Sequence, residues 1–267
     1  LQAFKKEIFF TDLTFEFVSS FDSYLQSRGY HLNTIAKHMK HLKRYVNIAI
    51  NKEYIEIQKY AFRKYKIKTV ENKHTHLVPE ELEQLERLSL TDKHMKLQKS
   101  LDAFLFCCYA GMRYSDFTNL SKKNIVDINQ ETWLIYKSVK TGTEVRLPLY
   151  LLFAGKGIVI LNKYRNNLED FFRLRDNSNI NKDLIIIAKL AGLSKKISFH
   201  TARHTNATLL IYNGVNITTV QKLLGHKSVK TTQVYTNIMD MTIVHDLEKI
   251  KQAALGIKKK TDNSFNK

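Results

Sequence analysis

The chain has 267 residues, and 43% of them are hydrophobic, which suits a packed core and excludes a disordered chain. Its 43 lysines and arginines outnumber 25 aspartates and glutamates, so the formal net charge is +18. This excess favours a polyanionic partner, nucleic acid before an acidic membrane surface, and no apolar run approaches the ~20 residues that cross a bilayer.

The two cysteines and the start of the chain indicate the cellular compartment of the protein. Cys107 and Cys108 are adjacent in an apolar stretch, so we expect two buried thiols in a reducing cytoplasm rather than a disulfide or a metal site. No signal peptide is visible, and the first residue is Leu rather than Met. We therefore expect a cytoplasmic protein without a membrane partner, and a start at Leu is compatible with a piece of a longer chain.

From residue 13 to about residue 65 the sequence has a helical pattern without strand-like alternation. Residues 15–29 form an amphipathic helix that ends at Gly29, and Asn33 is expected to cap a second helix over 34–51. Apolar residues of this second helix share one face, and basic residues share another. The basic face is either an ordinary solvated surface or a contact to the DNA backbone, and the charge of the chain favours DNA. Its residues are Lys37, Lys40, His41 and Arg44.

A polar break in the periodicity divides the chain in two. We predict a helical domain over 1–68, a linker over 69–77 and a second domain over 78–267 that includes a C-terminal tail. Pro79 is placed to open the first helix of the second domain. Residues 96–111 predict an apolar helix stopped by Gly111, and residues 131–149 predict two strands around a turn at Thr141 and Gly142.

Helices resume near residue 151 and continue to the end. The fold class expected is therefore mainly α with a small antiparallel β-hairpin. The tail over 257–267 is polar and basic, so it is either mobile or docked on a partner.

Six polar residues of the second domain stand out, although each has an ordinary structural explanation such as a helix cap, a salt bridge or a core aromatic. Together they supply what transfer of a DNA phosphodiester requires. Two guanidiniums can bind the non-bridging oxygens, a phenol can attack phosphorus, a lysine can protonate the leaving 5′ oxygen, and imidazoles can accept or donate a proton. The candidate residues are Arg113, Lys140, His200, Arg203, His226 and Tyr235.

A metal site is the competing interpretation of the helix over 199–212. His200 and His204 are four residues apart and share a helix face, as zinc ligands do. However, no glutamate lies between them, no third ligand is evident nearby, and Arg203 would repel a cation. We therefore expect no metal and no cofactor.

Four stretches together resemble the tyrosine recombinase (phage integrase) family. They are AGMRYSD, VKTG, HTARHTNATLL and LLGHKSVKTTQVYTNI, in that order, and the last is the most specific. The helical region before the linker resembles the core-binding, SAM-like domain of the same family. The resemblance implies an all-helical core-binding domain followed by a mostly helical catalytic domain.

The resemblance also implies a role for each matching residue. Tyr235 would attack the scissile phosphate and form a 3′-phosphotyrosyl link, and Lys140 would protonate the 5′ oxygen. Arg113 and Arg203 would bind the non-bridging oxygens. His200 would be the general base or a hydrogen-bond partner, and His226 would donate to the phosphate. Asp116 resembles the acidic residue that braces the first arginine, whereas His204 is expected to support packing or a buried hydrogen bond.

The activity implied is site-specific recombination of double-stranded DNA by a homotetramer on two duplexes, in the nucleoid, without ATP. Integration or excision of a mobile element is the leading task, and Xer-like resolution of chromosomes or plasmids, or DNA inversion, is the alternative. The remaining hypotheses are a type IB-like topoisomerase and a non-catalytic DNA-binding protein. The helix over 245–256 and the basic tail resemble the element that docks on a neighbouring subunit.

Two departures from the family accompany this resemblance. Asn206 stands where many relatives carry Phe. Larger integrases have an additional arm-binding domain that this sequence lacks, so we expect either a short recombinase or a chain from which that domain was removed.

Overall fold

The first 70 residues contain two α-helices in the computed structural model, which describes residues 1–70, 74–236 and 251. Helix α1 (Phe15–Ser27) is capped by the Thr14 hydroxyl, which accepts from the Phe17 N–H at 3.3 Å. Helix α2 (Leu32–Asn51) follows after Gly29, whose φ of 73° ends the first helix as expected. Short 3-10 turns η1 (Phe10–Asp12) and η2 (Ile57–Lys59) complete this part.

The cap predicted for the second helix was wrong. Helix α2 begins at Leu32, and its N-cap is His31, whose Nδ1 accepts from the Asn33 N–H at 3.3 Å. The Asn33 side chain instead exchanges two hydrogen bonds with the main chain of Val70, at 2.9 and 3.0 Å. A contact 37 residues away in sequence therefore occupies the amide that the local pattern assigned to the cap.

The apolar face predicted for α2 is confirmed. Its buried residues pack with α1 around a separate small core, and the exposed face carries the basic side chains. The buried residues of α2 are Ile35, Ala36, Met39, Leu42, Val46 and Ala49.

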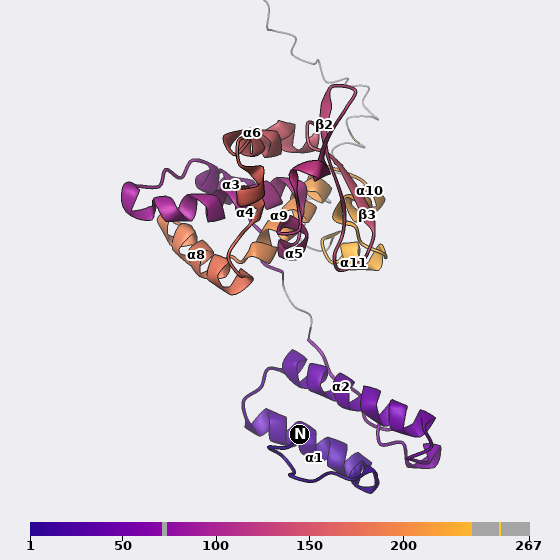
Figure 1. Ribbon diagram of the computed structural model, residues 1–267. Coiled ribbons are helices and arrows are strands. Elements are labelled where there is room, and N and C mark those ends of the chain that lie inside the picture. The colour runs from indigo at the N-terminus through magenta and orange to yellow at the C-terminus, as the bar shows by residue number, and fades with distance from the viewer. Residues whose placement is uncertain (71–73, 237–250, 252–267) are drawn as a thin grey trace, which may run out of the picture. The chain divides into compact units, whose positions relative to one another are not determined.

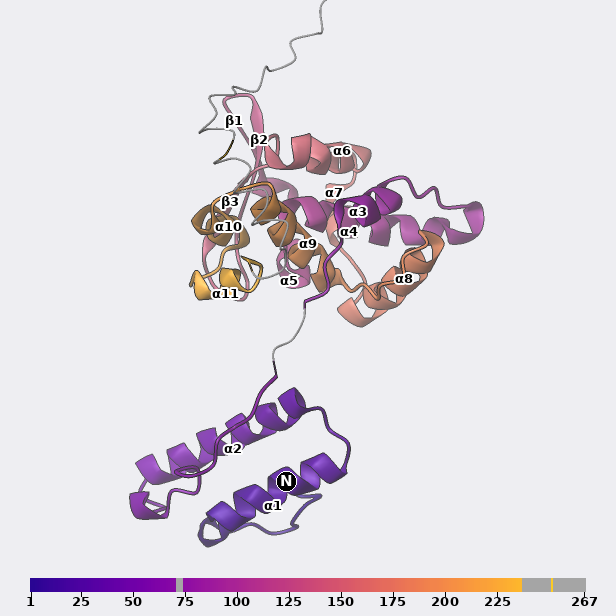
Figure 2. The same ribbon diagram turned by 180° about the vertical axis from the view of Figure 1, so that it is seen from behind.

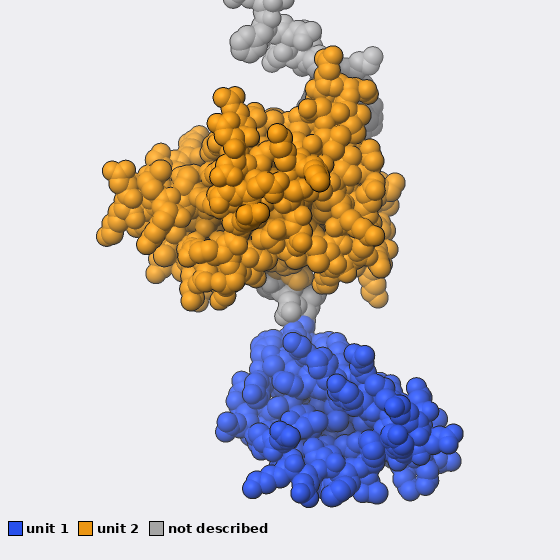
Figure 3. Space-filling model, viewed as in Figure 1, with its two compact units in different colours: residues 1–73 blue, residues 74–267 orange. Residues whose placement is uncertain are grey.

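The chain divides into two units, residues 1–73 and 74–267 (Figure 3). Residues 74–77, which the sequence analysis placed in the linker, belong to the second unit. There Leu77 is fully buried, and its N–H donates to Thr205 Oγ1 at 2.9 Å. The interpretation of the two units as a DNA-binding and a catalytic domain stays a prediction.

The second unit is mostly helical, and α9 lies at its centre with α4 and α10 packed against it (Figure 1, Figure 2). Helix α4 is almost entirely buried and also contacts α3, α6, α7 and α8. Cys107 and Cys108 lie on it, fully buried and unpaired as expected. The helices are α3 (Pro79–Glu86), α4 (Gln98–Ala110), α5 (Tyr114–Phe117), α6 (Lys156–Lys163), α7 (Leu168–Phe172), α8 (Asn177–Leu190), α9 (Phe199–Tyr212), α10 (Ile217–Leu224) and α11 (Lys230–Gln233). Short 3-10 turns are η3 (Asp92–Leu97), η4 (Lys122–Asn124) and η5 (Leu152–Gly155).

A three-stranded antiparallel sheet with order β1-β2-β3 completes the second unit. Strands β2 (Glu131–Lys137) and β3 (Glu144–Pro148) are the predicted hairpin, in the register Tyr136↔Val145. Strand β1 (Ile125–Ile128) was not predicted, and it joins β2 through a two-residue turn at Asn129 and Gln130 with positive φ. The expected class, mainly α with a small antiparallel sheet, is confirmed.

Gly111 and Asn206 together shape the end of α4. Gly111 ends α4 with a φ of 65°, and a Cβ there would meet Asn206 Oδ1 at 2.6 Å. The buried Asn206 amide donates to the carbonyls of Cys108 and Tyr109, both at 2.9 Å, and so closes the last turn of α4.

No helix in the described parts of the chain is long and apolar enough to cross a membrane.

Candidate active site

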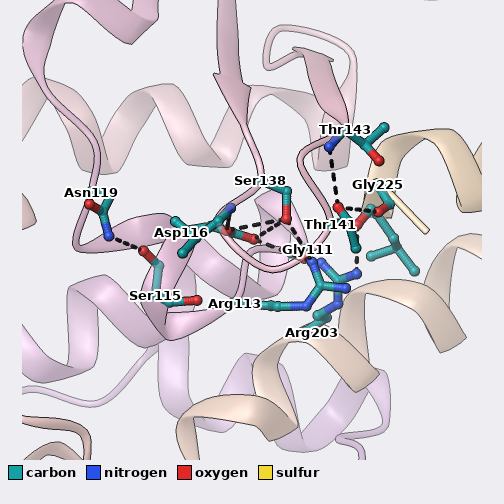
Figure 4. Close-up of polar contacts among 12 residues, drawn as sticks. Gly111, Arg113, Ser115, Asp116, Asn119, Ser138, Thr141, Thr143, Arg203 and Gly225 are labelled. Carbon is teal, nitrogen blue, oxygen red and sulfur yellow. Dashed lines mark hydrogen bonds and ion pairs between the residues drawn. The ribbon is translucent and has the colours of Figure 1, made fainter. Parts of the chain in front are cut away.

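Arg113 lies where the chain turns from α4 into α5. It is the N-cap residue of α5, and only 13% of its side chain is exposed. Its Nη1 donates to Asp116 Oδ2 at 3.3 Å and to Ser138 Oγ at 3.2 Å (Figure 4). The glycine turn and the short α5 therefore fix the guanidinium against a carboxylate on its own helix and a hydroxyl on the β2–β3 turn.

The Asp116 carboxylate connects Arg113 to the turn that carries Lys140. It is 1% exposed, and its Oδ1 accepts from the Val139 N–H at 2.8 Å. Lys140 is the next residue and is exposed at the turn. Thr141 Oγ1 donates to the carbonyl of Gly225 at 3.1 Å, so the same turn is also joined to the end of α10.

Arg203 is among the most deeply buried residues of the chain, with 1% of its surface exposed. From α9 it donates through Nη1 to the Gly111 carbonyl and through Nη2 to the Leu224 carbonyl, both at 2.6 Å. Its remaining N–H donors make no hydrogen bond with the described residues. Burial and the nearby charge of Arg113 lower the pKa of Arg203 to about 10, so it remains a cation at neutral pH. Figure 4 shows both arginine side chains reaching the same region.

His226 directly follows Gly225, which ends α10 with a φ of 62°. The imidazole is 8% exposed, and its Nδ1 lies 3.0 Å from Thr232 Oγ1. Burial, followed by the charges of Arg203 and Arg113, lowers the pKa of His226 to about 3. The ring is therefore neutral at physiological pH, and its Nε2 makes no hydrogen bond with the residues that the structure describes.

Tyr235 follows α11, and 5% of its surface is exposed. Its hydroxyl lies 3.1 Å from Nδ1 of His204 on α9. Burial raises the pKa of Tyr235, while Arg203 and Arg113 act in the opposite direction. The phenol therefore sits within the electrostatic reach of both arginines, and it is protonated at neutral pH.

His200 is exposed on the first turn of α9, and its ring meets that of His204 edge-on at 4.5 Å between centroids. Desolvation, with Arg203 and Arg113 next in effect, lowers the pKa of His200 to about 4. Lys140 contributes to the lowered pKa of both His200 and His226. The six candidate residues thus form one electropositive cluster with Asp116 at its edge, and such a cluster favours an anion.

The four basic residues predicted to bind DNA lie on the first unit. Lys37, Lys40, His41 and Arg44 are all exposed on α2. The first three line a shallow groove together with Asn33, Thr69 and Val70. Their role stays a prediction.

A metal ion finds no ligand set in the part of the chain that the structure describes. No group of three or more His, Cys, Asp or Glu residues there could hold one. His200 and His204, the pair that suggested zinc, meet each other, His74 and Tyr235 instead.

Residues 75–241 match the phage integrase family, and residues 1–67 match the phage integrase SAM-like domain. The chain belongs to the phage integrase family. Tyrosine recombinase XerC of Rickettsia prowazekii is 30% identical over 159 residues, which are 56% of this chain and 49% of that protein. The chain spans about half to three fifths of the length of the first curated relatives it matches.

Two solved structures show the integrase fold in proteins of low sequence identity. The lambda integrase (75–356) dimer bound to a COC′ core site has a TM-score of 0.68 at 18% identity, over 84% of this chain and 80% of that one. The Tn1549 transposon integrase (82–397) in complex with circular intermediate DNA has a TM-score of 0.67 at 16% identity, over 88% and 84%. The fold of this chain is therefore that of the phage integrases.

His74 lies beside the tyrosine and was not predicted from sequence. His74 stacks on the ring of His204, with centroids 4.4 Å apart. Nothing in the local sequence around His74 distinguishes it from the other polar residues of the break between the two regions. His204 was expected to make a buried hydrogen bond, but its partner could not be known from sequence.

Proposed function

We propose that this integrase-family chain cleaves and rejoins specific DNA sites through a covalent 3′-phosphotyrosyl intermediate. The observation that carries the proposal is the gathering of Arg113, Arg203, the Lys140 turn, His226 and Tyr235 in one electropositive cluster. A cluster with a buried carboxylate at its edge suits a phosphodiester, and some of its guanidinium donors make no bond within the described parts of the chain.

The proposed step exchanges one phosphate ester bond for another. The Tyr235 oxygen bonds to phosphorus, the bond from phosphorus to the 5′ oxygen breaks, and Lys140 protonates that oxygen as it leaves. The phenolic proton passes to the neutral imidazole of His200. A 5′ hydroxyl from a partner strand reverses the step, so the phosphotyrosyl bond conserves the energy and ATP is not needed.

Arg113 and Arg203 would bind the non-bridging oxygens during this step, where negative charge develops. Arg203 is anchored by two main-chain carbonyls, and Arg113 is anchored by Asp116 and Ser138. His226 would donate a further hydrogen bond through Nε2, because its Nδ1 is engaged with Thr232. Side chains held in this way lose little freedom when a phosphate binds.

Contacts with the rest of the duplex would come from the first unit. The exposed face of α2 with Lys37, Lys40, His41 and Arg44 can neutralise backbone phosphates without reading base sequence. We therefore propose that the first unit holds DNA and that the second unit performs the chemistry. The net charge of +18 fits such a partner, which in a bacterial cell places the protein on the nucleoid.

The assembly we propose is a homotetramer on two duplexes. Exchange between two duplexes breaks four strands, and each chain offers one Tyr235, so four copies are required. Docking of the helix over 245–256 on a neighbouring subunit remains our proposal, and apart from residue 251 that segment lies outside the described residues.

Integration or excision of a mobile element is the biological task that we propose, and the likeness in fold to a transposon integrase supports it. Xer-like resolution is the second candidate, favoured by the relatives named XerC. Mapping the bound sites in the host genome separates the two. Sites at the ends of an inserted element indicate integration or excision, and a single chromosomal site indicates resolution.

A pool of short duplexes with a randomised centre and one nick tests the activity itself. Cleavage near the nick releases a short fragment, so the covalent complex accumulates, survives denaturant and can be sequenced. The selected site is then placed on two duplexes of different length. Products of recombinant length support a recombinase, relaxation of supercoiled DNA alone indicates a topoisomerase, and binding without any covalent complex indicates a non-catalytic DNA-binding protein.

A further inference from the structure

Three histidines cluster near the tyrosine proposed as nucleophile, and two of them, His74 and His204, have no role in the proposed reaction. The His204 ring bonds the Tyr235 hydroxyl at 3.1 Å and is itself 8% exposed. His74 stacks on one face of the His204 ring at 4.4 Å, and His200 meets it edge-on at 4.5 Å. The His74 and Tyr235 ring centroids are 6.4 Å apart.

The segment that carries His74 is fastened to α9 beside His204. The Leu77 N–H donates to the hydroxyl of Thr205, the residue after His204, and Leu77 is fully buried. Lys195 bonds the carbonyl of His76 at 3.3 Å. His74 is also the first residue of the second unit.

We propose that His204 is a positioning residue that holds the Tyr235 hydroxyl in a guarded place before cleavage, and that His74 sets how firmly it is held. This inference rests on the proposed function, because it gives Tyr235 the role of nucleophile. The Tyr235 hydroxyl is bonded to His204 and the residue is 5% exposed, so the phenol oxygen has to leave His204 before it attacks phosphorus. The hydrogen bond to His204 opposes that departure.

The properties of the two groups fit restraint rather than proton transfer. Burial, followed by neighbouring histidines, lowers the pKa of His204 to about 3, while burial raises the pKa of Tyr235. The phenol therefore keeps its proton in the free chain. When the proton of the neutral His204 ring lies on Nε2, Nδ1 accepts the hydroxyl hydrogen, and the contact acts as a restraint on Tyr235.

Nitration of Tyr235 in the free chain tests the restraint without DNA. The tryptic peptide 231–249 contains Tyr235 as its one tyrosine, so mass spectrometry follows this site among the 13 tyrosines. His204→Phe keeps a ring for His74 but removes the acceptor, and we expect nitration about three- to tenfold faster, the worth of one ordinary hydrogen bond. His204→Asn keeps an acceptor near the Nδ1 position and should restore the wild-type rate. Equal nitration in wild type and His204→Phe would overturn the proposal.

His74→Ala removes the stacked ring and leaves the His204 side chain in place, so it covers the case in which His204→Phe does not fold. We expect nitration of Tyr235 about two- to threefold faster than in wild type, because loss of one ring contact is a smaller change. An unchanged nitration rate in His74→Ala would show that His74 does not affect the restraint. Unchanged nitration rates in His74→Ala and in His204→Phe would overturn the whole proposal.

The consequence for cleavage is measured by single turnover on a nicked duplex selected from the randomised pool. His204→Phe should form the covalent complex faster than wild type at unchanged DNA affinity, and His204→Asn should match wild type. A rate at or below that of wild type would overturn the proposal, and a fall of about 100-fold would identify His204 as a base instead. Tyr235→Phe tells the two proposals apart, because an adduct in that variant refutes the nucleophile while the nitration result still reports on the contact.

Discussion

Arg203 Nη1 donates to the carbonyl oxygen of Gly111 at 2.6 Å, and Gly111 lies two residues before Arg113 in the chain. The other end of the same guanidinium holds the carbonyl of Leu224, two residues before His226. One buried cation therefore joins the ends of α4 and α10, from which two other candidate residues project. Its structural and catalytic contributions are coupled, and substitutions have to be interpreted with both in mind.

Arg203→Lys should lower both stability and cleavage. A single ammonium cannot reach both carbonyls, so one buried acceptor loses its partner, at a cost of about 1–3 kcal/mol in the free energy of unfolding. Covalent complex formation should fall about 10²- to 10³-fold, as for other lost oxyanion donors. Urea unfolding and adduct assays measure the two effects. Arg87→Lys, at an exposed ion pair with Glu83, is the control and should change stability by less than about 0.5 kcal/mol. Equal stabilities of the two variants would contradict the role of Arg203 in joining the ends of α4 and α10.

Asp116→Asn tests the link between Arg113 and the Lys140 turn. The carboxylate accepts from Arg113, from Ser138 and from the Val139 N–H, and an amide would lose the ion pair and offer one acceptor instead of two. We expect a loss of about 1–3 kcal/mol in stability and of about 10- to 100-fold in adduct formation, by analogy with outer partners of other charged sites. Ser138→Ala is the matched control with a smaller loss. A destabilised Asp116→Asn that cleaves at the wild-type rate would separate Asp116 from the site.

Tyr136→Phe should stabilise the protein or leave its stability unchanged. The Tyr136 hydroxyl is buried and makes no hydrogen bond with the described residues, so its removal gains up to about 1 kcal/mol. Tyr109→Phe is the control, because that hydroxyl donates to Glu86 at 2.7 Å and its loss should cost about 1–3 kcal/mol. Thermal or urea unfolding of the pair decides, and a Tyr136→Phe variant that loses as much as Tyr109→Phe would show that the hydroxyl has a partner.

Stability of the second unit should decline in mild acid because two buried histidines resist protonation. The pKa values of His204 and His226 are lowered to about 3, against an ordinary value of 6.5. Below pH 6.5 the unfolded chain binds protons that the folded chain does not, so the unfolding free energy falls by about 1.4 kcal/mol per pH unit for each histidine until about pH 3. Urea unfolding from pH 7 to 4.5 should give a shallower slope for His226→Asn than for wild type. His94→Gln, away from the site, should keep the wild-type slope, and equal slopes in all three chains would refute this cause.

Sequence alone predicted much of the fold, and the reasons are visible in particular residues. Helix α2 was recognised from the periodicity of Ile35, Met39, Leu42 and Val46, and α4 was correctly ended at Gly111. Strand β1 was missed, because its turn uses Asn129 and Gln130 rather than a turn glycine. The cap at Asn33 failed because its amide is taken by Val70, a contact that local rules do not contain.

The candidate site was predicted as a set of residues but not as a geometry. Six residues were selected from the chemistry that they supply together and from the family resemblance of their motifs: Arg113, Lys140, His200, Arg203, His226 and Tyr235. That Arg203 would be buried on two carbonyls, and that His204 rather than His200 would meet the Tyr235 hydroxyl, depends on the packing of α9 against α4 and α10. The place of His74 beside His204 depends on contacts of its segment with α9, such as the bond from the Leu77 N–H to Thr205, for which the local sequence holds no signal.

The most direct measurement of the central claim is a map of the covalent bond between protein and DNA. After cleavage of the nicked duplex, the adduct is digested with trypsin and the DNA is trimmed to a nucleotide remnant. We predict the remnant on Tyr235 within peptide 231–249, joined through a 3′ phosphate. The other DNA end should carry a free 5′ hydroxyl. Tyr235→Phe should abolish the adduct, and Tyr136→Phe should not. A remnant on any other peptide, a 5′ linkage, or an adduct that persists in Tyr235→Phe would contradict the account.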